Sequence, residues 1–394
     1  MCMNSLQIKT CIVTTGRADY GPLLPLIIKL INSKRYNIYI VPTGTHLSQA
    51  HGMTINEIKK DGFVVDHFVE MTQKHDSEHD ICKAISKGLR GFSTIYHNIQ
   101  PDIIIVLGDR YELWAACIPA VIHQIPIAHI HGGEATFGAI DDCIRHSITK
   151  ISSLHFASIE QYAKRIIQMG EDPEKVFIVG ALGIDNIKNI ELMDYEELSN
   201  YTGVNFKKRI ALMTFHPVTL DDRNLAVHQV RKVLNSLLQF DLLTLITMPN
   251  ADPAGNLVFE EIQQYMQKYP VNFKFIKNLG QKAYLSAMKY AALMIGNSSS
   301  GIVESASFKL PVVNVGERQE GRLKPLNVID SNYSEDAIIK AINQALSKEF
   351  ILSISKLKNP YGDGFTSNRI VKILNSIDIK EKKQLIKKYF IDLD

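Results

Sequence analysis

Side chains that could move protons gather just after two apolar runs in the first half of the chain. Asp109 follows the run Ile103–Leu107, and the string from His129 to Glu134 closes the next such run. Open α/β sheets bind ligands at the carboxyl ends of their strands, and carboxylates and imidazoles there can carry out general acid–base chemistry. The first candidates for catalysis are therefore Asp109, His131 and Glu134.

A helical pattern directly downstream adds acidic groups and a cation. Asp142, Arg145 and His146 share one face of this helix, because they stand three and four residues apart. Asp141 opens the same pattern, so Asp141 and Asp142 join the catalytic candidates. The alternative interpretation is a structural network of caps and ion pairs.

A metal site is a further alternative, since His129 and His131 form a His-x-His pair with acidic residues nearby. In that interpretation the carboxylates would be ligands in a hydrolase. The second half of the chain argues against it, because it carries phosphate-binding loops that a simple metallohydrolase does not require. We therefore expect no bound metal.

Residues suited to phosphate binding follow an apolar run in the second half. Ser298, Ser299 and Ser300 stand between two glycines, before a predicted helix that contains Glu304. Hydroxyls and backbone N–H groups at a helix N-terminus can bind phosphate, whereas capping alone needs one serine. Arg318 follows the next strand pattern and suits bidentate contact with a phosphate.

Two other turns add weaker candidates for anion binding. The glycine turn Thr15–Gly21 contains Arg17 and opens a helix. His216 follows the first apolar run of the second half, where a core histidine is the alternative interpretation. The chain has neither a Gly-x-Gly-x-x-Gly string nor a Walker A motif, which disfavours dinucleotide-binding and P-loop proteins.

The elements that must position these residues alternate between short β-branched runs and longer amphipathic stretches. This pattern predicts an α/β fold with two doubly wound, Rossmann-like domains. Polar residues interrupt the rhythm, so we expect an N-terminal domain over 1–185, a linker over 186–208 and a C-terminal domain over 209–358. Helices within 359–394 are expected to cross back to the first domain. The predicted strands are Ile8–Thr15, Asn37–Pro42, Gly62–Val69, Ile103–Leu107, Ile125–Ile130, Leu154–Ala157, Val176–Val179, Arg209–Thr214, Leu242–Met248, Asn272–Phe275, Leu293–Ile295 and Val312–Val315.

Composition excludes several classes of protein. The 44 basic and 41 acidic residues leave a net charge of +3, too small for a general polyanion-binding surface, so no nucleic-acid partner is expected. No apolar run of about 18 residues and no signal-like start occur, so we expect a cytoplasmic protein without a membrane partner. The five cysteines form no Cys-x-x-Cys pair and are expected to be reduced. The tail Lys380–Lys388 predicts a solvated helix face.

Six strings in the chain together carry a family resemblance. They are similar to the hydrolysing UDP-N-acetylglucosamine 2-epimerases of bacterial sialic acid (nonulosonic acid) synthesis, which are related to the epimerase half of the animal bifunctional enzyme. The resemblance covers nearly the whole chain in the right order. The strings are Thr15–Tyr20, Gly108–Arg110, His129–Glu134, Ile144–Lys150, Thr214–Pro217 and Gly296–Gly301.

The resemblance implies the GT-B fold, with the active site in the cleft between the two domains. It also implies conversion of UDP-N-acetylglucosamine and water to N-acetylmannosamine and UDP, without a metal, nicotinamide or other cofactor. A base removes the C2 proton as UDP leaves C1; water then adds to C1 while a proton returns to the opposite face of C2. Stabilising the departing diphosphate is a large part of such catalysis. Relatives are commonly homodimers or homotetramers, so self-association is expected.

The resemblance also implies roles for individual residues. Asp109 and Asp141 match acid–base carboxylates, and a third such position, Glu in the animal enzyme, is His131 here. We expect the His131 imidazole to serve as proton shuttle or hydrogen-bond donor, oriented by Glu134 or Asp141. Gly21 stands at a UDP-binding position where the animal enzyme has a serine. The other UDP-binding positions are Arg17, Arg110, His216, Ser298, Ser299, Glu304 and Arg318, and Ser300 of the same turn joins them.

The substrate is less well defined than the reaction. We favour UDP-N-acetylglucosamine, for sialic acid synthesis. The alternative is UDP-2,4-diacetamido-2,4,6-trideoxyglucose (UDP-N,N'-diacetylbacillosamine), the substrate of a similar bacterial subgroup that leads to legionaminic acid. A retaining GT-B glycosyltransferase, which would use the same UDP site with an acceptor, is a more remote alternative.

Overall fold

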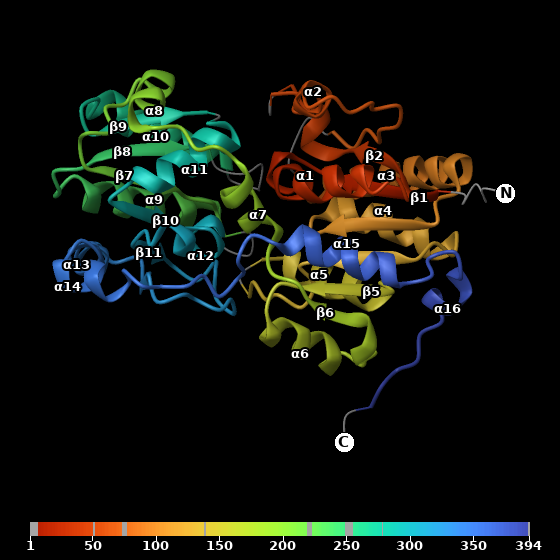
Figure 1. Ribbon diagram of the computed structural model, residues 1–394. Helices are drawn as coiled ribbons and strands as arrows, with labels where there is room; N and C mark the ends of the chain where they lie inside the picture. Colours follow the sequence, from red (N-terminus) through yellow and green to blue (C-terminus); the bar gives the residue numbers. More distant parts are fainter. Residues whose placement is uncertain are drawn as a thin grey trace. The chain divides into compact units, whose positions relative to one another are not determined.

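A computed structural model describes residues 7–49, 52–72, 77–137, 139–218, 223–248, 255–277 and 279–392. The chain folds into two compact units. Unit 1 comprises Met1–Glu134, Asp141–Asn186 and Tyr361–Asp394, and unit 2 comprises Ala135–Ile140 and Ile187–Pro360. Figure 1 shows a parallel sheet in each unit with helices on both of its faces.

The sheet of unit 1 has six strands in the order β2-β1-β3-β4-β5-β6, all paired in parallel. Two of its central strands, β1 and β3, are buried almost throughout on both faces, as expected for a sheet that helices cover on both sides. The strands are β1 (Ile8–Thr14), β2 (Tyr36–Pro42), β3 (Ile103–Leu107), β4 (Ile127–Ile130), β5 (Leu154–Ala157) and β6 (Val176–Ile178).

Two hydrophobic clusters hold the helices of unit 1 on its sheet. Residues of α1 and α15 contribute to the cluster on one face. Residues of α3, α4 and α5 contribute to the other. The helices are α1 (Arg17–Asn32), α2 (Ile55–Lys60), α3 (Glu78–Ile99), α4 (Tyr111–Ile122), α5 (Asp141–Ile151), α6 (Glu160–Gln168), α7 (Leu182–Asn189, which ends in unit 2), α15 (Thr366–Ser376) and α16 (Lys382–Ile386), with short 3-10 helices η1 (Gly44–Leu47) and η2 (Pro173–Lys175).

Unit 2 repeats this architecture with the strand order β12-β11-β10-β7-β8-β9, again in parallel. Its strands are β7 (Ile210–Thr214), β8 (Leu243–Thr247), β9 (Phe273–Ile276), β10 (Leu293–Gly296), β11 (Val312–Val315) and β12 (Val328–Ser331). Residues of α9, α10 and α13 pack on one face, and residues of α8 and α11 pack on the other. The helices are α8 (Tyr195–Thr202), α9 (Arg223–Leu237), α10 (Gly255–Lys268), α11 (Gly280–Tyr290), α12 (Ser300–Val303), α13 (Glu335–Ala345) and α14 (Lys348–Ser353), with η3 (Ser305–Phe308).

Both sheets have a switch point, where the order of the strands reverses along the sheet. In unit 1 it lies between β1 and β3, and in unit 2 between β7 and β10. Ligands of doubly wound sheets bind outside the carboxyl ends of the strands at such a point. The prediction of two doubly wound domains is confirmed, and the candidate strings that follow β1, β3, β7 and β10 lie at these two places.

Two strand predictions differ from the structure. The segment 62–69 forms no strand: residues 63–68 have no regular secondary structure, and Val69 makes an isolated bridge to Thr43. Phe63 and Val65 instead pack against the hydrophobic core, while Val64 between them is exposed. The short edge strand β12 was not predicted, because its four residues contain only two apolar ones.

The stretch 186–208, predicted to be a linker, contains the end of α7 and the whole of α8. Its charged residues are helix signals: the Asp194 side chain accepts hydrogen bonds from the backbone N–H groups of Glu196 and Glu197, and Glu197 reaches back to the Asp194 N–H. Leu198 of the same helix is fully buried. The segment therefore packs into unit 2 by an apolar face that its polar composition conceals.

The lysines of the tail are also not a purely solvated face. Lys380 forms an ion pair with Asp102, and Lys388 donates to the carboxylate of Glu171 at 2.6 Å. Glu171 is almost completely buried and also contacts Lys150 and His155. The tail thus neutralises carboxylates of unit 1. The described cysteines Cys11, Cys82, Cys117 and Cys143 are free, and Cys2 lies outside the described residues.

Candidate active site

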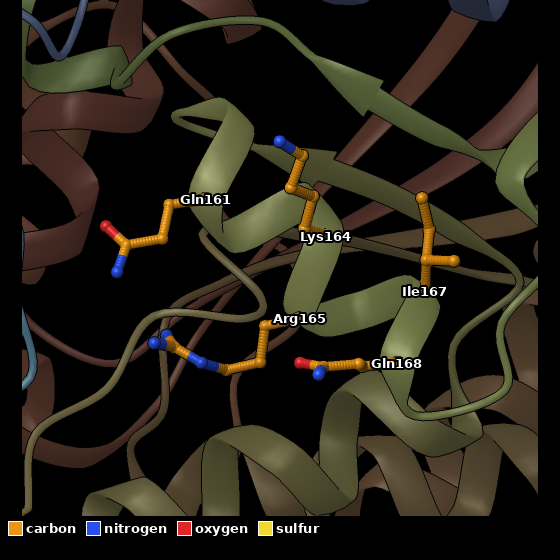
Figure 2. A pocket seen from close by; sticks show the side chains of 5 residues that line it. All are labelled: Gln161, Lys164, Arg165, Ile167 and Gln168. Carbon is orange, nitrogen blue, oxygen red and sulfur yellow. The ribbon is translucent and has the colours of Figure 1, made fainter. Parts of the chain in front are cut away.

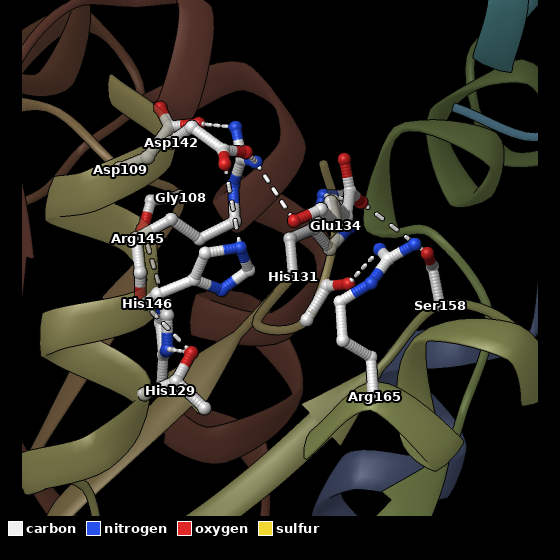
Figure 3. A network of polar contacts seen from close by, with 12 residues as sticks. Gly108, Asp109, His129, His131, Glu134, Asp142, Arg145, His146, Ser158 and Arg165 are labelled. Carbon is white, nitrogen blue, oxygen red and sulfur yellow. Dashed lines mark hydrogen bonds and ion pairs between the residues drawn. The ribbon is translucent and has the colours of Figure 1, made fainter. Parts of the chain in front are cut away.

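The carboxylate of Asp109, at the turn after β3, is held by the guanidinium of Arg145 (Figure 3). Arg145 comes from α5 and is 1% exposed. Its Nη1 donates to Asp142 Oδ1 and to the backbone carbonyl of Glu134, both at 2.9 Å. One buried cation therefore gathers three of the five predicted catalytic residues in unit 1.

The charge of Arg145 is maintained by its neighbours. Burial opposes it, but the carboxylates of Asp109, Glu134 and Asp142 raise the pKa of the guanidinium above its ordinary value. His146 lies on the same helix with its Nε2 3.5 Å from Asp142 Oδ2. The cluster thus places a buried cation against the side chains of Asp109 and Asp142, and carboxylates of this kind can act in proton transfer.

His129 has a structural position rather than a metal-binding one. Its Nε2 lies 2.8 Å from the carbonyl oxygen of Gly108, and its Nδ1 lies 3.2 Å from the hydroxyl of Thr149. Because a carbonyl only accepts, Nε2 carries the proton of the ring. Burial lowers the pKa of His129 to about 3, so the ring is neutral at physiological pH. His129 thus secures the turn that carries Asp109.

The His-x-His metal alternative therefore loses one of its two ligands to a backbone carbonyl. Among the residues that the structure describes, no group of three or more His, Cys, Asp or Glu side chains is arranged to hold a metal ion. None of the described helices is long and apolar enough to cross a membrane.

His131 differs from His129 in both exposure and backbone conformation. Its side chain is 18% exposed, and its φ of +65° is rare for a residue with a side chain. Nδ1 lies 3.4 Å from Glu134 Oε1, and Nε2 accepts a hydrogen bond from the backbone N–H of Leu182 at 3.4 Å. The structure thus brings Glu134 to His131, as the sequence predicts for an oriented imidazole. A strained conformation of this kind is typical of functional sites.

The loop after His131 is held by hydrogen bonds from residues in α6 and just before it. Arg165 donates to the carbonyl oxygen of Gly133, and Ser158 donates to Glu134 Oε1 at 3.3 Å (Figure 3). Gly133 has a φ of +72°, and a Cβ there would lie 2.3 Å from the carbonyl oxygen of Tyr162. Only glycine fits this position. Arg165 also lines a surface hollow of about 510 Å³ beside α6 (Figure 2), together with Gln161, Lys164, Ile167 and Gln168.

Asp141 and Asp142 open α5, and both are half-buried. Gly21, in contrast, lies inside α1 and is buried, with its carbonyl oxygen accepting a hydrogen bond from Asn186 Nδ2 at 2.8 Å. The backbone of Gly21 is therefore engaged within unit 1. Arg17, at the start of the same helix, is exposed.

Asp19 orders the turn that carries Arg17. Its carboxylate accepts four hydrogen bonds, from Thr14 Oγ1, from both the N–H and the hydroxyl of Thr15, and from the N–H of Gly16. A Cβ on Gly16 would lie 2.4 Å from Thr45 Oγ1. A side chain at position 16 would therefore have to displace the Thr45 hydroxyl, which belongs to the loop that follows β2 and braces this turn.

The loop after β2, which contains Gly44, Thr45 and His46 and is called the bracing loop below, was not singled out from the sequence. Thr45 donates its N–H and its hydroxyl to the carbonyl oxygen of Thr15. His46 is fully buried between the hydroxyls of Thr14 and Thr54, and burial lowers its pKa. The available signal was its place, since these polar residues directly follow a predicted strand.

The turns of unit 2 are joined by Asn297, a completely buried side chain. Its Oδ1 accepts from the N–H of His216 at 2.7 Å, and its Nδ2 donates to the His216 carbonyl at 2.8 Å. Gly296 has a φ of +131°, and a Cβ there would lie 2.0 Å from the carbonyl oxygen of Thr214. Asn297 and Gly296 thus bring the turns after β7 and β10 together at the switch point.

The backbone carbonyl of Asn297 also accepts hydrogen bonds from two side chains of the loop after β11. Arg318 Nη1 donates to it at 3.2 Å and Gln319 Nε2 at 2.8 Å. Ser298, Ser299, Ser300 and Glu304 are half-buried on the adjoining turn. Tyr284 of α11, another residue missed from the sequence, interacts with Ser298, Ser300 and Thr214, and burial raises its pKa. The predicted UDP-binding residues His216, Ser298, Ser299, Ser300, Glu304 and Arg318 therefore share one region of unit 2.

Two doubly wound units, each with polar side chains at its switch point, give this chain the GT-B fold, in which ligands bind outside the carboxyl ends of the strands. A solved structure agrees in fold: the Neisseria meningitidis UDP-GlcNAc 2-epimerase bound to UDP-GlcNAc superimposes with a TM-score of 0.80 over 94% of this chain and all of that one, at 18% identity.

Sequence comparisons give the family. The profile of the UDP-N-acetylglucosamine 2-epimerase family matches residues 29–375. A Campylobacter jejuni protein named GDP/UDP-N,N'-diacetylbacillosamine 2-epimerase (hydrolyzing) is 39% identical over 98% of this chain and 99% of its own. A Legionella pneumophila UDP-N,N'-diacetylbacillosamine 2-epimerase (hydrolyzing) is 37% identical (94% and 96%), and the Escherichia coli polysialic acid biosynthesis protein P7 is 34% identical (97% of each). The chain therefore belongs to the UDP-N-acetylglucosamine 2-epimerase family, and the prediction of an epimerase enzyme is confirmed.

Proposed function

We propose that this protein is a hydrolysing 2-epimerase that acts on UDP-2,4-diacetamido-2,4,6-trideoxyglucose and releases UDP and the epimerised free sugar. The observation that carries this choice is the similarity, over nearly the whole chain, to two relatives that are named for this substrate, at 39% and 37% identity. It replaces UDP-N-acetylglucosamine, which the sequence analysis favoured.

UDP-N-acetylglucosamine stays as the second candidate substrate. The family whose profile matches is named for this sugar nucleotide, and a relative at 34% identity carries the name of a polysialic acid biosynthesis protein. The two candidates differ at C4 and C6 of the sugar, away from the C1 and C2 centres where the reaction occurs. The proposed chemistry is therefore the same for both.

The reaction joins an elimination to a hydration. A base takes the C2 proton, the C1–O bond breaks and its electron pair leaves with UDP, so an unsaturated sugar forms. Water then adds its oxygen to C1, and a proton is delivered to the opposite face of C2. Substrate and water supply every atom, and no electrons are exchanged with a carrier, so the reaction as proposed needs no redox cofactor.

In this proposal, the unit 1 cluster transfers protons. Asp109 is paired with Arg145, and the imidazole of His131 lies beside Glu134, so the cluster holds two side chains of the kinds that carry out acid–base catalysis. Asp141 and Asp142 add two more carboxylates, in the first turn of α5. We assign proton transfer to Asp109, His131 and Asp141, with Glu134 and Asp142 as supporting groups.

The UDP-binding role is proposed for the arginines at the turns and for the serine turn. Contact with the diphosphate is proposed for Arg17, for Arg110 and for Arg318, because a guanidinium can stabilise the charge of departing UDP. The hydroxyls of Ser298, Ser299 and Ser300 would donate to phosphate oxygens. His216 would donate to the same group, and Glu304 can accept from ribose hydroxyls.

We propose that the protein forms a homo-oligomer, and light scattering would measure its mass in solution.

Turnover of both UDP-sugars by the purified protein, with EDTA and without any acceptor, tests this function. We expect UDP release from each, with kcat/KM at least tenfold higher for the diacetamido sugar. The opposite preference would restore UDP-N-acetylglucosamine, and dependence on an acceptor would indicate a glycosyltransferase. In heavy water, NMR should show deuterium at C2 of the product; a product without it would refute the elimination.

A further inference from the structure

Glu112 is a carboxylate buried where three loops of unit 1 meet. It belongs to the first turn of α4 and is 1% exposed. A Cβ placed on Gly44 would lie 2.7 Å from Glu112 Oε1 and 2.8 Å from the carbonyl oxygen of Thr15. Thr15, Gly44 and Arg110 follow the neighbouring strands β1, β2 and β3, so Glu112 sits at the switch point of this sheet.

The approach of Glu112 depends on a glycine in the bracing loop. Gly44 has a φ of +57°, and any side chain on it would displace both the Glu112 carboxylate and the carbonyl of Thr15. The loop after β2 is therefore shaped to admit this carboxylate. A side chain that merely filled space here would not need to be ionisable.

Burial of a carboxylate costs free energy that a nearby cation must offset. Burial raises the pKa of Glu112, while the charge of Arg110 acts in the opposite direction. Glu112 Oε2 lies 3.5 Å from Arg110 Nε, and within the described residues it accepts no hydrogen bond. Arg110 is thus the cation in position to compensate this oxygen.

The contact also determines how the guanidinium is presented. Arg110 occupies the N-cap position of α4, and its side chain is 28% exposed. Its guanidinium carbon lies 5.6 Å from the ring centre of Tyr111. Glu112 Oε2 lies on the Nε side of the guanidinium, whereas the two Nη groups form its end-on pair of donors. That pair has the geometry for bidentate contact with a phosphate.

We infer that Glu112 is a positioning residue that holds Arg110 in the orientation required to bind the diphosphate of the UDP-sugar. The inference rests on the proposed function, in which Arg110 contacts UDP. It adds a residue behind the site that does not itself touch the substrate. Its effect should therefore appear in the binding of UDP and should disappear when Arg110 is absent.

The test is a double-mutant cycle of Glu112→Gln and Arg110→Met, read by calorimetry with UDP and by steady-state kinetics. Glu112→Gln keeps the shape and removes the charge; we expect UDP to bind about tenfold more weakly and KM to rise by a similar factor, with kcat changed less than threefold. In the Arg110→Met background, the same substitution should change UDP affinity less than twofold.

Glu160→Gln is the matched control, because Glu160 also stands in the first turn of a unit 1 helix and pairs with a cation, Lys164, but is exposed. It should leave UDP binding unchanged. Glu112→Asp keeps the charge one methylene further away and should give an intermediate loss, which guards against misfolding of the glutamine variant. Folding is followed by the fluorescence of Trp114.

The outcomes separate the inference from the proposed function. If the wild-type enzyme turns over neither UDP-sugar, the proposed function fails. If Arg110→Met weakens UDP binding but neither Glu112 variant does, or if the two losses simply add, the positioning role is refuted. If Arg110→Met binds UDP normally, Arg110 is not a diphosphate contact, and the role of Glu112 falls with it.

Discussion

Lowering the pH should destabilise unit 1 through His129, whose ring is fully buried and neutral. An ordinary histidine has a pKa of about 6.5, while that of His129 is lowered to about 3 by burial. Between these values the unfolded chain binds a proton that the folded chain does not. Stability therefore rises with pH in this window: the contribution is complete above about pH 6.5 and is lost as the pH falls toward 3.

The size of the effect follows from the two pKa values. From neutral pH down to pH 5, His129 alone should reduce the free energy of unfolding by about 2 kcal/mol, at about 1.4 kcal/mol per unit below 6.5. Burial also lowers the pKa of His46 and His155, so both act in the same direction. The total acid sensitivity of unit 1 should exceed the contribution of any one of them.

The assay is urea unfolding at pH 7 and pH 5, followed by the fluorescence of Trp114. This is the single tryptophan of the chain and lies on α4, so its signal reports unit 1. His129→Gln should reduce the difference between the two pH values by about 2 kcal/mol. His97→Gln is the control, because His97 is exposed on α3. A His129→Gln protein with the full wild-type pH dependence would refute this account.

Other substitutions test candidate residues of unit 1, candidate residues of unit 2, and the contacts of the tail. His131→Ala should lower kcat by about 10² to 10⁴-fold with normal UDP affinity by calorimetry, and a near-normal kcat would leave His131 a structural residue. Arg318→Ala should instead weaken UDP binding, and unchanged affinity would remove it from the site. Gly296→Ala should lower the thermal midpoint of unit 2 and UDP affinity together, because its Cβ would meet the Thr214 carbonyl at 2.0 Å; normal values of both would contradict the close approach. Glu171→Ala should cost about 2 kcal/mol in urea unfolding, since it leaves Lys150 and Lys388 without their shared carboxylate, and Lys388→Met alone should cost less.

Much of the architecture could be predicted because it depends on local patterns. β3 is a run of five apolar residues that only a sheet covered on both faces can bury, and it was predicted with its observed bounds. The polar strings after the strands were found for the same reason, since the chain must leave a parallel sheet at its carboxyl edge. Family membership also follows from short strings whose order along the chain is preserved.

Other assignments depended on contacts between residues far apart in the chain. His129 and His131 stand two residues apart, yet one is locked to the carbonyl of Gly108 and the other faces Glu134 at a positive φ. Alternation along a strand cannot distinguish them, because their difference arises where β4 ends and the backbone turns. The same holds for segment 62–69, whose side chains alternate in exposure but whose backbone forms only one isolated bridge, from Val69 to Thr43.

The pattern of residues along the chain determined that it folds as two α/β units and carries acidic, imidazole and arginine groups at the ends of its strands. Tertiary structure decided which of these groups act on one another. Asp109 meets Arg145 and Asp142 because β3 and β4 lie side by side, and Glu112 lies against Gly44 because β2, β1 and β3 are neighbours in the sheet. The physical reason is that burial and charge pairing depend on distance in space, which the order of strands in a sheet sets and the order of residues in a chain does not.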